Sequence, residues 1–109
     1  MAEERALGPL EELRRRIDLL DESLVRLLSA RAACALEIGR VKKAEGLPVY
    51  QPTREAEVLA HVQRINQGPL DNPAIRRLFE RIIDEARRLE RLADEREAAA
   101  RAHDPGEHA

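Results

Sequence analysis

Residues 13–41, LRRRIDLLDESLVRLLSARAACALEIGRV, decide the fold of this chain. Apolar side chains recur here in steps of four and three residues, at Leu13, Ile17, Leu20, Leu24, Leu27, Cys34, Ile38 and Val41. This spacing is typical of one continuous apolar stripe along a long helix. Arg31 occupies the step after Leu27, where an apolar residue would continue the stripe. An arginine stays charged and is costly to bury alone, so we expect an anion, from the chain or from a ligand, beside Arg31.

The composition excludes several classes of protein. The 109 residues suffice for one small domain, and with 37% charged and 2% aromatic residues its core must be aliphatic, which is typical of long helices. A net charge of −2 argues against a general nucleic-acid binder. The single cysteine, Cys34, fits a reducing compartment, and we expect it to be a small core residue of a cytoplasmic protein. We find neither a signal peptide nor an apolar run of ~20 residues that would span a membrane.

Proline and glycine divide the chain into helical segments, and no strand-like alternation appears. Gly39 lies within the first apolar pattern, which continues past it, so we interpret it as tolerated inside the helix. The predicted helices run from Pro9 to a break at Gly46 and Pro48, from Pro52 to a break at residues 66–69, and from Asn72, as the capping residue before Pro73, to about Arg96.

These segments predict an all-α fold with one long and two shorter helices. We expect residues 1–8 to be a flexible N-terminus, residues 9–96 to be the helical domain and residues 97–109 to be a disordered tail. A first helix of ~50 Å cannot be covered by helices of ~22 Å and ~35 Å from the same chain. Because monomers avoid large exposed apolar strips, we predict an intertwined, symmetric homodimer.

A few charged residues are candidates for a binding site. Arg31 and Lys42 are eleven residues apart and project from nearly the same side of the first helix. Arg14 lies about a quarter turn away from Arg31, and in an antiparallel or crossed dimer it could serve the partner's pocket. Glu90 shares a face with apolar residues, which predicts either a raised pKa or a cationic partner. A surface ion pair of Glu90 with Arg87 or Arg91 is the alternative.

The other polar residues give weaker signals. Arg54 and Glu55 fall in the first turn of the second helix, where Glu55 also suits the helix dipole and Arg54 suits solvent. The histidines have no Cys or His neighbours at the spacing of metal ligands, so we expect no metal. The sequence also has no glycine loop that would cradle a phosphate, and we expect no cofactor. Several arginines alternate with acids at helical spacing and are interpreted as exposed ion pairs, namely Arg15, Arg16, Arg76, Arg77, Arg87 and Arg88.

Four sets of residues in register resemble the all-helical class of chorismate mutases. They are Leu13-Arg14 with Ile17-Asp18, Leu27-Leu28 with Arg31, Ile38-Gly39 with Lys42, and Pro48-Val49 with Arg54-Glu55; the segment 78–85 resembles the start of that family's third helix. The resemblance covers about residues 10–93. It implies an intertwined helical dimer, without a cofactor, that converts the dianion chorismate to prephenate in the biosynthesis of phenylalanine and tyrosine.

The resemblance also implies roles for individual residues. Arg31 and Lys42 would bind the substrate from one subunit and Arg14 from the other, while Arg54 would line the pocket and Glu55 would hold the ring hydroxyl. Position 90 would share the ether oxygen with Lys42, which makes Lys42, Glu90 and Arg31 the catalytic set.

Three site positions depart from the commonest pattern of the family. Gln51 stands where an Asp is frequent, and its backbone would serve instead; Ala86 stands where a Ser can contact a carboxylate. Glu90 stands where a Gln is frequent. A Gln donates a hydrogen bond at any pH, whereas a Glu donates only when protonated. We therefore predict a raised pKa for Glu90 or an activity that favours mildly acidic pH.

Alternative functions remain open at the level of sequence. An isochorismate pyruvate-lyase shares this fold and much of the cationic pocket. A helical dimerisation module without an active site is the non-enzymatic reading, in which Arg31→Leu would only stabilise the protein. A mutase that depends on a partner enzyme of the aromatic pathway is a further reading of the same residues.

Overall fold

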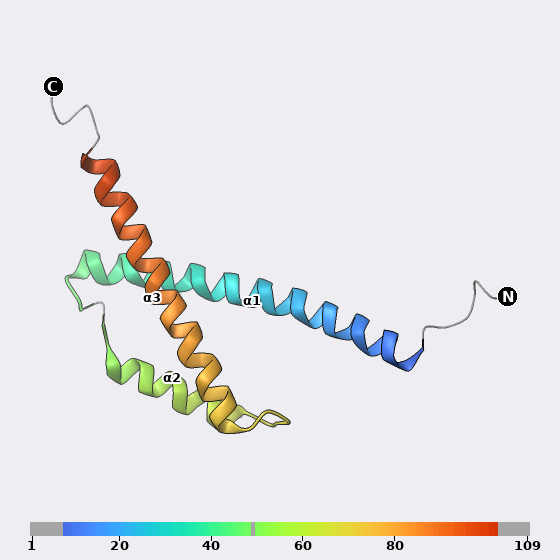
Figure 1. The fold of residues 1–109 in the computed structure, drawn as a ribbon. Helices are drawn as coiled ribbons and strands as arrows, with labels where there is room; N and C mark the ends of the chain where they lie inside the picture. Colours follow the sequence, from blue (N-terminus) through green and yellow to red (C-terminus); the bar gives the residue numbers. More distant parts are fainter. Residues whose placement is uncertain (1–7, 49, 103–109) are drawn as a thin grey trace. The chain divides into compact units, whose positions relative to one another are not determined.

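The computed structural model describes residues 8–48 and 50–102, and within these ranges it contains three helices and no strand (Figure 1). They are α1 (Pro9–Glu45), α2 (Pro52–Ile65) and α3 (Asn72–Ala102). The predicted all-α fold is therefore confirmed. The prediction of a flexible N-terminus falls almost entirely outside the described residues, as does the part of the predicted tail from residue 103 on. None of the described helices is long and apolar enough to cross a membrane.

Helix α1 begins and ends where proline and glycine predict. Pro9 is the first helical residue, and Glu11 and Glu12 lie in the first turn, where carboxylates favour the positive end of the helix dipole. At the other end Gly46 adopts a φ of 70°, which a glycine reaches without steric cost. Its N–H donates to the Lys43 carbonyl at 3.3 Å, and the Leu47 N–H donates to the Lys42 carbonyl at 2.8 Å. This pair of bonds is a Schellman motif, and it satisfies carbonyls that the helix end would leave unpaired.

The turn between α2 and α3 corrects one prediction about capping. Asp71, not Asn72, caps α3, because its Oδ1 accepts the N–H of Ala74 at 2.8 Å. The Asn72 side chain instead accepts a hydrogen bond from Asn66 Nδ2 at 2.9 Å. Asn66 also donates to the Leu70 carbonyl at 2.7 Å, so its amide organises the whole turn.

Helix α3 is longer than predicted. It continues past Arg96 to Ala102, so residues 97–102 are helical rather than part of a disordered tail. Alanine has the highest helix propensity, which explains why the run of Ala98, Ala99 and Ala100 continues the helix. Its 31 residues correspond to ~46 Å rather than the predicted ~35 Å. The comparison of helix lengths therefore no longer argues for a dimer.

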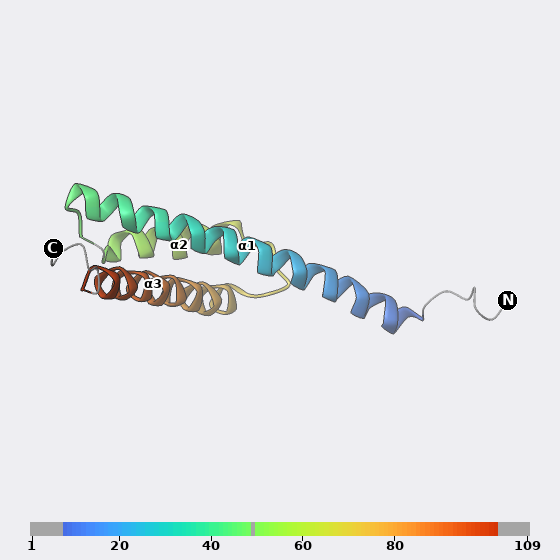
Figure 2. The ribbon, with the colours of Figure 1, turned by 90° about the horizontal axis from the view of Figure 1, so that it is seen from above.

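The described core is small and lies between α2 and α3, which contact each other on either side of their shared turn (Figures 1 and 2). Leu59 and Val62 on α2 are its buried residues, each with 8% of its surface exposed. Both belong to the apolar face that the sequence predicts for the second helix. The packing of α2 on α3 fixes the start of α2 against the middle of α3, which is where the candidate site residues of these helices lie.

The chain divides into two compact units, residues 1–31 and 32–109. Within the first unit, α1 leaves a row of apolar side chains more than half exposed, namely Leu13, Ile17, Leu20, Leu24 and Leu27. Within the second unit, Ile38 and Val41 are also more than half exposed. Cys34 is exposed as well, contrary to its prediction as a core residue, because no described segment of the single chain covers it. The apolar stripe of α1 thus exists as predicted but is uncovered.

Candidate active site

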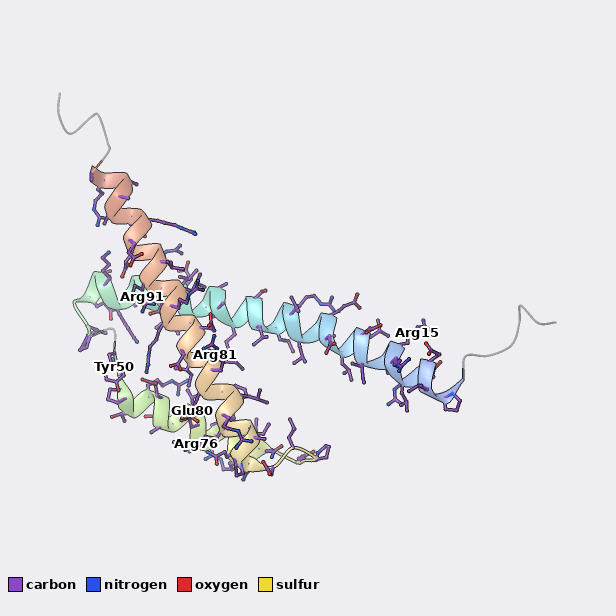
Figure 3. All side chains as sticks on the ribbon, viewed as in Figure 1. Arg15, Tyr50, Arg76, Glu80, Arg81 and Arg91 are labelled. Atoms are coloured by element: carbon purple, nitrogen blue, oxygen red, sulfur yellow. The ribbon has the colours of Figure 1, made fainter. Side chains whose placement is uncertain are left out.

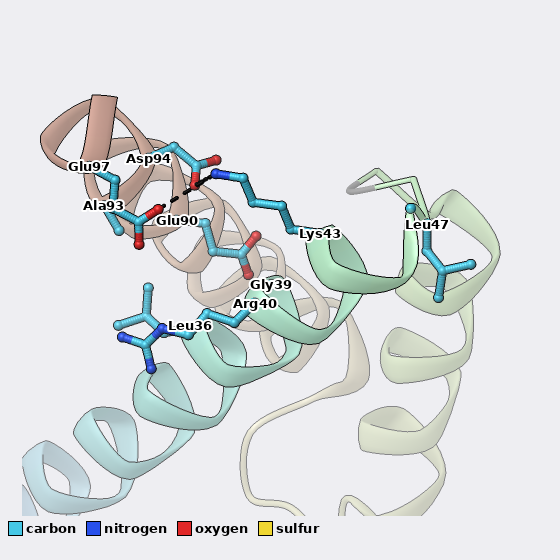
Figure 4. A pocket seen from close by; sticks show the side chains of 10 residues that line it. Leu36, Gly39, Arg40, Lys43, Leu47, Glu90, Ala93, Asp94 and Glu97 are labelled. Carbon is cyan, nitrogen blue, oxygen red and sulfur yellow. Dashed lines mark ion pairs between the residues drawn. The ribbon is translucent and has the colours of Figure 1, made fainter. Parts of the chain in front are cut away.

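The site is built around Glu90, whose side chain from α3 lies against α1. A Cβ atom added to Gly39 would lie 3.6 Å from Cδ of Glu90 and 3.8 Å from its Oε2. The Glu90 carboxyl therefore packs on the backbone of α1 at the one position of that turn that has no side chain (Figure 4). A methyl group at position 39 would make ordinary van der Waals contact with Glu90, so the two helices approach closely here without requiring a glycine.

Burial raises the pKa of the Glu90 carboxyl above its ordinary value of 4.5. The Lys42 ammonium lowers the pKa of Glu90 because it favours the carboxylate form, and the Arg87 guanidinium does the same more weakly. The Asp94 carboxylate raises the pKa because a second negative charge is disfavoured beside it. Because desolvation is the largest of these effects, the neutral form of Glu90 persists to higher pH than that of a solvated glutamate. The sequence-based expectation of a raised pKa agrees with this environment.

A cavity of about 370 Å³ adjoins Glu90 within the second unit (Figure 4). Leu36 and Leu47 from α1 and its C-terminal loop, together with Ala93 from α3, supply its apolar lining. Lys43 Nζ lies 3.6 Å from Asp94 Oδ1 and 3.5 Å from Glu97 Oε2, so two exposed ion pairs join α1 to α3 at this cavity. Glu97 belongs to the part of α3 that exceeds its predicted length.

A second polar group joins α2 to α3. Glu55, in the first turn of α2, forms an ion pair with Arg87 of α3. The Arg87 guanidinium carbon also lies 4.9 Å from the centre of the Tyr50 ring, which is cation–π distance, and Arg87 Nη1 lies 3.5 Å from Asp84 Oδ1. Tyr50 lies just before α2 (Figure 3). The prediction that Arg87 is an exposed ion-pair residue is therefore wrong in part, because it is half-buried and connects two elements.

The other predicted site residues of the second unit lie near this group. Gln51 and Ala86 are half-buried. The Gln51 backbone carbonyl accepts the N–H groups of Arg54 and Glu55, at 3.1 and 3.3 Å, so it starts α2. Arg54 is exposed, and its Nη1 lies 3.3 Å from Glu57 Oε2. The structure thus gathers Lys42, Glu55 and Glu90 with the unpredicted Arg87, whereas Arg54 is paired at the surface.

Arg14 and Arg31 belong to the first unit. Arg14 is exposed and its Nη1 lies 3.3 Å from Glu11 Oε1, whereas Arg31 is half-buried. Exposed pairs of the expected kind also line α3, where Arg76 Nε lies 3.8 Å from Glu80 Oε1 (Figure 3). Surface pairs of this kind contribute about 0–1 kcal/mol each.

The chemistry that these groups offer is hydrogen bonding and electrostatic stabilisation. A neutral carboxyl at Glu90 and an ammonium at Lys42 are both donors, suited to an oxygen atom that gains negative charge. Glu55 is an acceptor suited to a hydroxyl group. Among the described residues no group of three or more His, Cys, Asp or Glu side chains is arranged to hold a metal ion.

Comparison with known proteins shows which sequences and structures this chain is similar to. The family described as chorismate mutase type II matches residues 13–91. A bifunctional chorismate mutase/prephenate dehydratase of Stutzerimonas stutzeri is 49% identical over 86 residues, which cover 74% of this chain and 24% of that protein. The chain therefore spans about a quarter of the length of this curated relative.

Solved structures agree with the sequence match. The structure of chorismate mutase (form II) from Thermus thermophilus is similar with a TM-score of 0.73 and 39% identity, over 75% of this chain and 93% of that one. A chorismate mutase from Helicobacter pylori, solved in complex with prephenate, gives a TM-score of 0.72 and 30% identity, over 79% and 93% of the two chains.

Proposed function

This chain belongs to the chorismate mutase type II family, and we propose that it is an isomerase that rearranges chorismate to prephenate. The observation that carries the proposal is the placement of Glu90. Its carboxyl is half-buried against Gly39 with a raised pKa, and it lies within the electrostatic influence of the Lys42 ammonium. The match to the family over residues 13–91 and the likeness to mutases of similar length support the same activity. Prephenate would then feed the biosynthesis of phenylalanine and tyrosine.

The reaction needs positioning and electrostatics rather than a nucleophile. It is intramolecular: the C–O bond of the ether breaks as a C–C bond forms, and no atom enters or leaves. Holding chorismate in its compact conformer removes much of the entropic barrier. As the C–O bond breaks, negative charge grows on the ether oxygen, and hydrogen bonds from the Lys42 ammonium and the protonated Glu90 carboxyl strengthen in the transition state.

The remaining candidate residues would bind the rest of the dianion. We propose that Arg31 and Arg54 bind substrate carboxylates, since a guanidinium can bind a carboxylate through two parallel hydrogen bonds. Glu55 would hold the ring hydroxyl, and Gln51 would contribute through its backbone. Ala86 would line the pocket without a hydrogen bond, because it has no hydroxyl.

We also propose that the enzyme is a homodimer to which each chain gives Arg14 for its partner's site. The support for a dimer is the row of leucine and isoleucine side chains on the first part of α1 that are more than half exposed. Covering such a row is favourable by about 25 cal/mol for each Å² of apolar surface removed from water. A second copy of α1 presents the same apolar spacing and would cover it.

The cellular context is part of the proposal. The single cysteine is compatible with a reducing cytoplasm, where we place the enzyme. The relative from Stutzerimonas stutzeri is named for a mutase and a prephenate dehydratase together. We propose that this chain likewise works beside an enzyme that consumes prephenate, as a separate partner or as a neighbouring domain.

The test is a progress curve for the loss of chorismate absorbance with the purified chain, followed by identification of the product. Prephenate supports the proposal. The same chain is then given isochorismate, because release of pyruvate from it without any turnover of chorismate would identify the alternative, a pyruvate-lyase of the same fold. Turnover of neither compound would leave two alternatives, a mutase that depends on a partner enzyme and a non-catalytic helical dimerisation module.

A further inference from the structure

Arg87 contacts three separate groups in the site region, and the proposed reaction gives it no contact with the substrate. It forms an ion pair with Glu55 on α2, lies 4.9 Å from the centre of the Tyr50 ring, and lies 3.5 Å from Asp84 Oδ1 on its own helix. Its side chain is 40% exposed and that of Glu55 is 27% exposed. Both charges are thus partly withdrawn from water. A partly buried ion pair is screened less than one at the open surface.

The two contacts with Glu55 and Tyr50 use different parts of the guanidinium. Its Nη2 faces the Glu55 carboxylate in an ion pair, and its central carbon lies over the Tyr50 ring at cation–π distance. A guanidinium held by two contacts of this kind has less rotational freedom than a solvated one. The segment before α2, the first turn of α2 and the middle of α3 are therefore joined at one side chain.

Glu55 benefits from this restraint because of its place in the helix. It lies in the first turn of α2, where the helix dipole favours a carboxylate but does not choose its rotamer. A free glutamate side chain loses conformational entropy when it is fixed in one rotamer. With Arg87 in place that ordering is complete before any ligand arrives, and the lone pairs that Arg87 leaves unused remain available to a hydroxyl group.

We propose that Arg87 is a positioning residue for Glu55: the guanidinium, held on Tyr50, orients the Glu55 carboxylate to accept the ring hydroxyl of the substrate. This inference rests on the proposed function of the site. Arg87 itself needs no contact with the substrate, and it acts through Glu55. The Asp84 carboxylate, which is 61% exposed, is a weaker competitor for the same guanidinium because solvent screens it more.

The role requires arginine rather than positive charge alone. A lysine ammonium at this position would still attract Glu55, but it has no planar face for Tyr50 and no fork of N–H groups. We therefore expect kcat/KM of Arg87→Lys to lie between that of Arg87→Gln and that of the unaltered enzyme.

The experiment is a double-mutant cycle of Arg87→Gln, Glu55→Gln and the double variant, with kcat and KM for chorismate measured for each and thermal unfolding followed by circular dichroism. The matched control is Arg88→Gln, one residue further along α3, whose side chain is 61% exposed and pairs with Glu85 at 3.7 Å. We expect Arg87→Gln to lower kcat/KM about tenfold, mainly through KM, because the hydroxyl is held in the bound substrate as well as in the transition state. In the Glu55→Gln background, adding Arg87→Gln should lower kcat/KM less than about twofold. Arg88→Gln should have the kcat and KM of the unaltered protein.

Three results would overturn the inference. Losses that multiply in the double variant would mean that Arg87 acts independently of Glu55. A lower melting temperature with unchanged kinetic constants would assign Arg87 a purely structural role. An Arg87→Lys variant as active as the unaltered enzyme would show that positive charge alone suffices and would remove the requirement for a held guanidinium. If the unaltered chain does not turn over chorismate at all, the proposed function fails first, and this inference fails with it.

Discussion

The most informative perturbation is Glu90→Gln, because the two side chains have the same shape and differ in when they can donate a hydrogen bond. The Glu90 carboxyl donates only while it is protonated, whereas an amide donates at every pH. Activity of the unaltered enzyme should therefore follow the protonated fraction of Glu90. It should be constant well below the pKa of Glu90 in the folded enzyme and fall about tenfold for each pH unit above that value.

The surroundings of Glu90 set where this fall occurs. Burial raises its pKa, Lys42 lowers it, Asp94 raises it and Arg87 lowers it. Replacing Asp94 by Asn removes a like charge, so the pKa of Glu90 should drop and the fall in activity should move to lower pH. Glu90→Gln should abolish the fall and make the variant faster than the unaltered enzyme at pH 8.

The same shift has a consequence for stability, whose sign follows from the raised pKa. The folded state keeps its proton on Glu90 at pH values where the unfolded chain has lost it. The contribution is fully present below about 4.5, the ordinary pKa of a glutamate, and is lost as the pH rises through the higher pKa of the folded state. Thermal unfolding of Glu90→Gln should lack this component of the pH dependence.

The assay is the initial rate of chorismate loss from pH 5 to pH 8, at saturating substrate, for the unaltered enzyme, Glu90→Gln and Asp94→Asn. A rate that is flat across this range in the unaltered enzyme and equally flat in Glu90→Gln would refute the donor role of Glu90. A fall toward acid pH would refute it as well, because it would make the carboxylate the active form.

Three further predictions concern other residues. Lys42→Ala should lower kcat about 10²–10³-fold, measured in the same assay, since it removes a charged donor to the ether oxygen; a change below threefold would contradict its role. Arg31→Leu should abolish turnover while leaving the melting temperature unchanged or raised, since it removes a charge from an apolar stripe; an active variant would contradict a substrate contact. Asp71→Ala should lower stability by about 1 kcal/mol, seen as a lower denaturation midpoint, because α3 loses its capping hydrogen bond; an unchanged midpoint would contradict the capping assignment.

The helices were predictable from the sequence because proline and glycine act locally. Pro9, Gly46 and Pro52 impose their backbone preferences whatever surrounds them, and the observed ends of α1 and the start of α2 fall at these residues. The errors are of a different kind. Asp71 and Asn72 are both good capping residues. The choice between them depends on Asn66, six positions before Asn72, because the Asn66 amide donates a hydrogen bond to the Asn72 side chain. The end of α3 beyond Arg96 depends on alanines that read equally well as a frayed tail.

The candidate site was predictable only in part. Arg31 attracts attention because it interrupts an apolar stripe, and Glu90 because a carboxylate shares an apolar face. Arg87 gave no such signal, since its acidic neighbour Asp84, three positions earlier, explains it as a surface pair. Its contacts with Glu55 and Tyr50 arise from the packing of α2 on α3, which no local spacing encodes. The approach of the Glu90 side chain to Gly39 is likewise a contact between helices, which no local spacing encodes.

The central claim is tested most directly by following chorismate with the purified chain by proton magnetic resonance at pH 6. We predict that chorismate signals decay while prephenate signals grow in equal amount, with no pyruvate, and that the rate in excess of the spontaneous reaction is proportional to enzyme concentration. A decay no faster than without enzyme, or one accompanied by pyruvate in place of prephenate, would contradict the account.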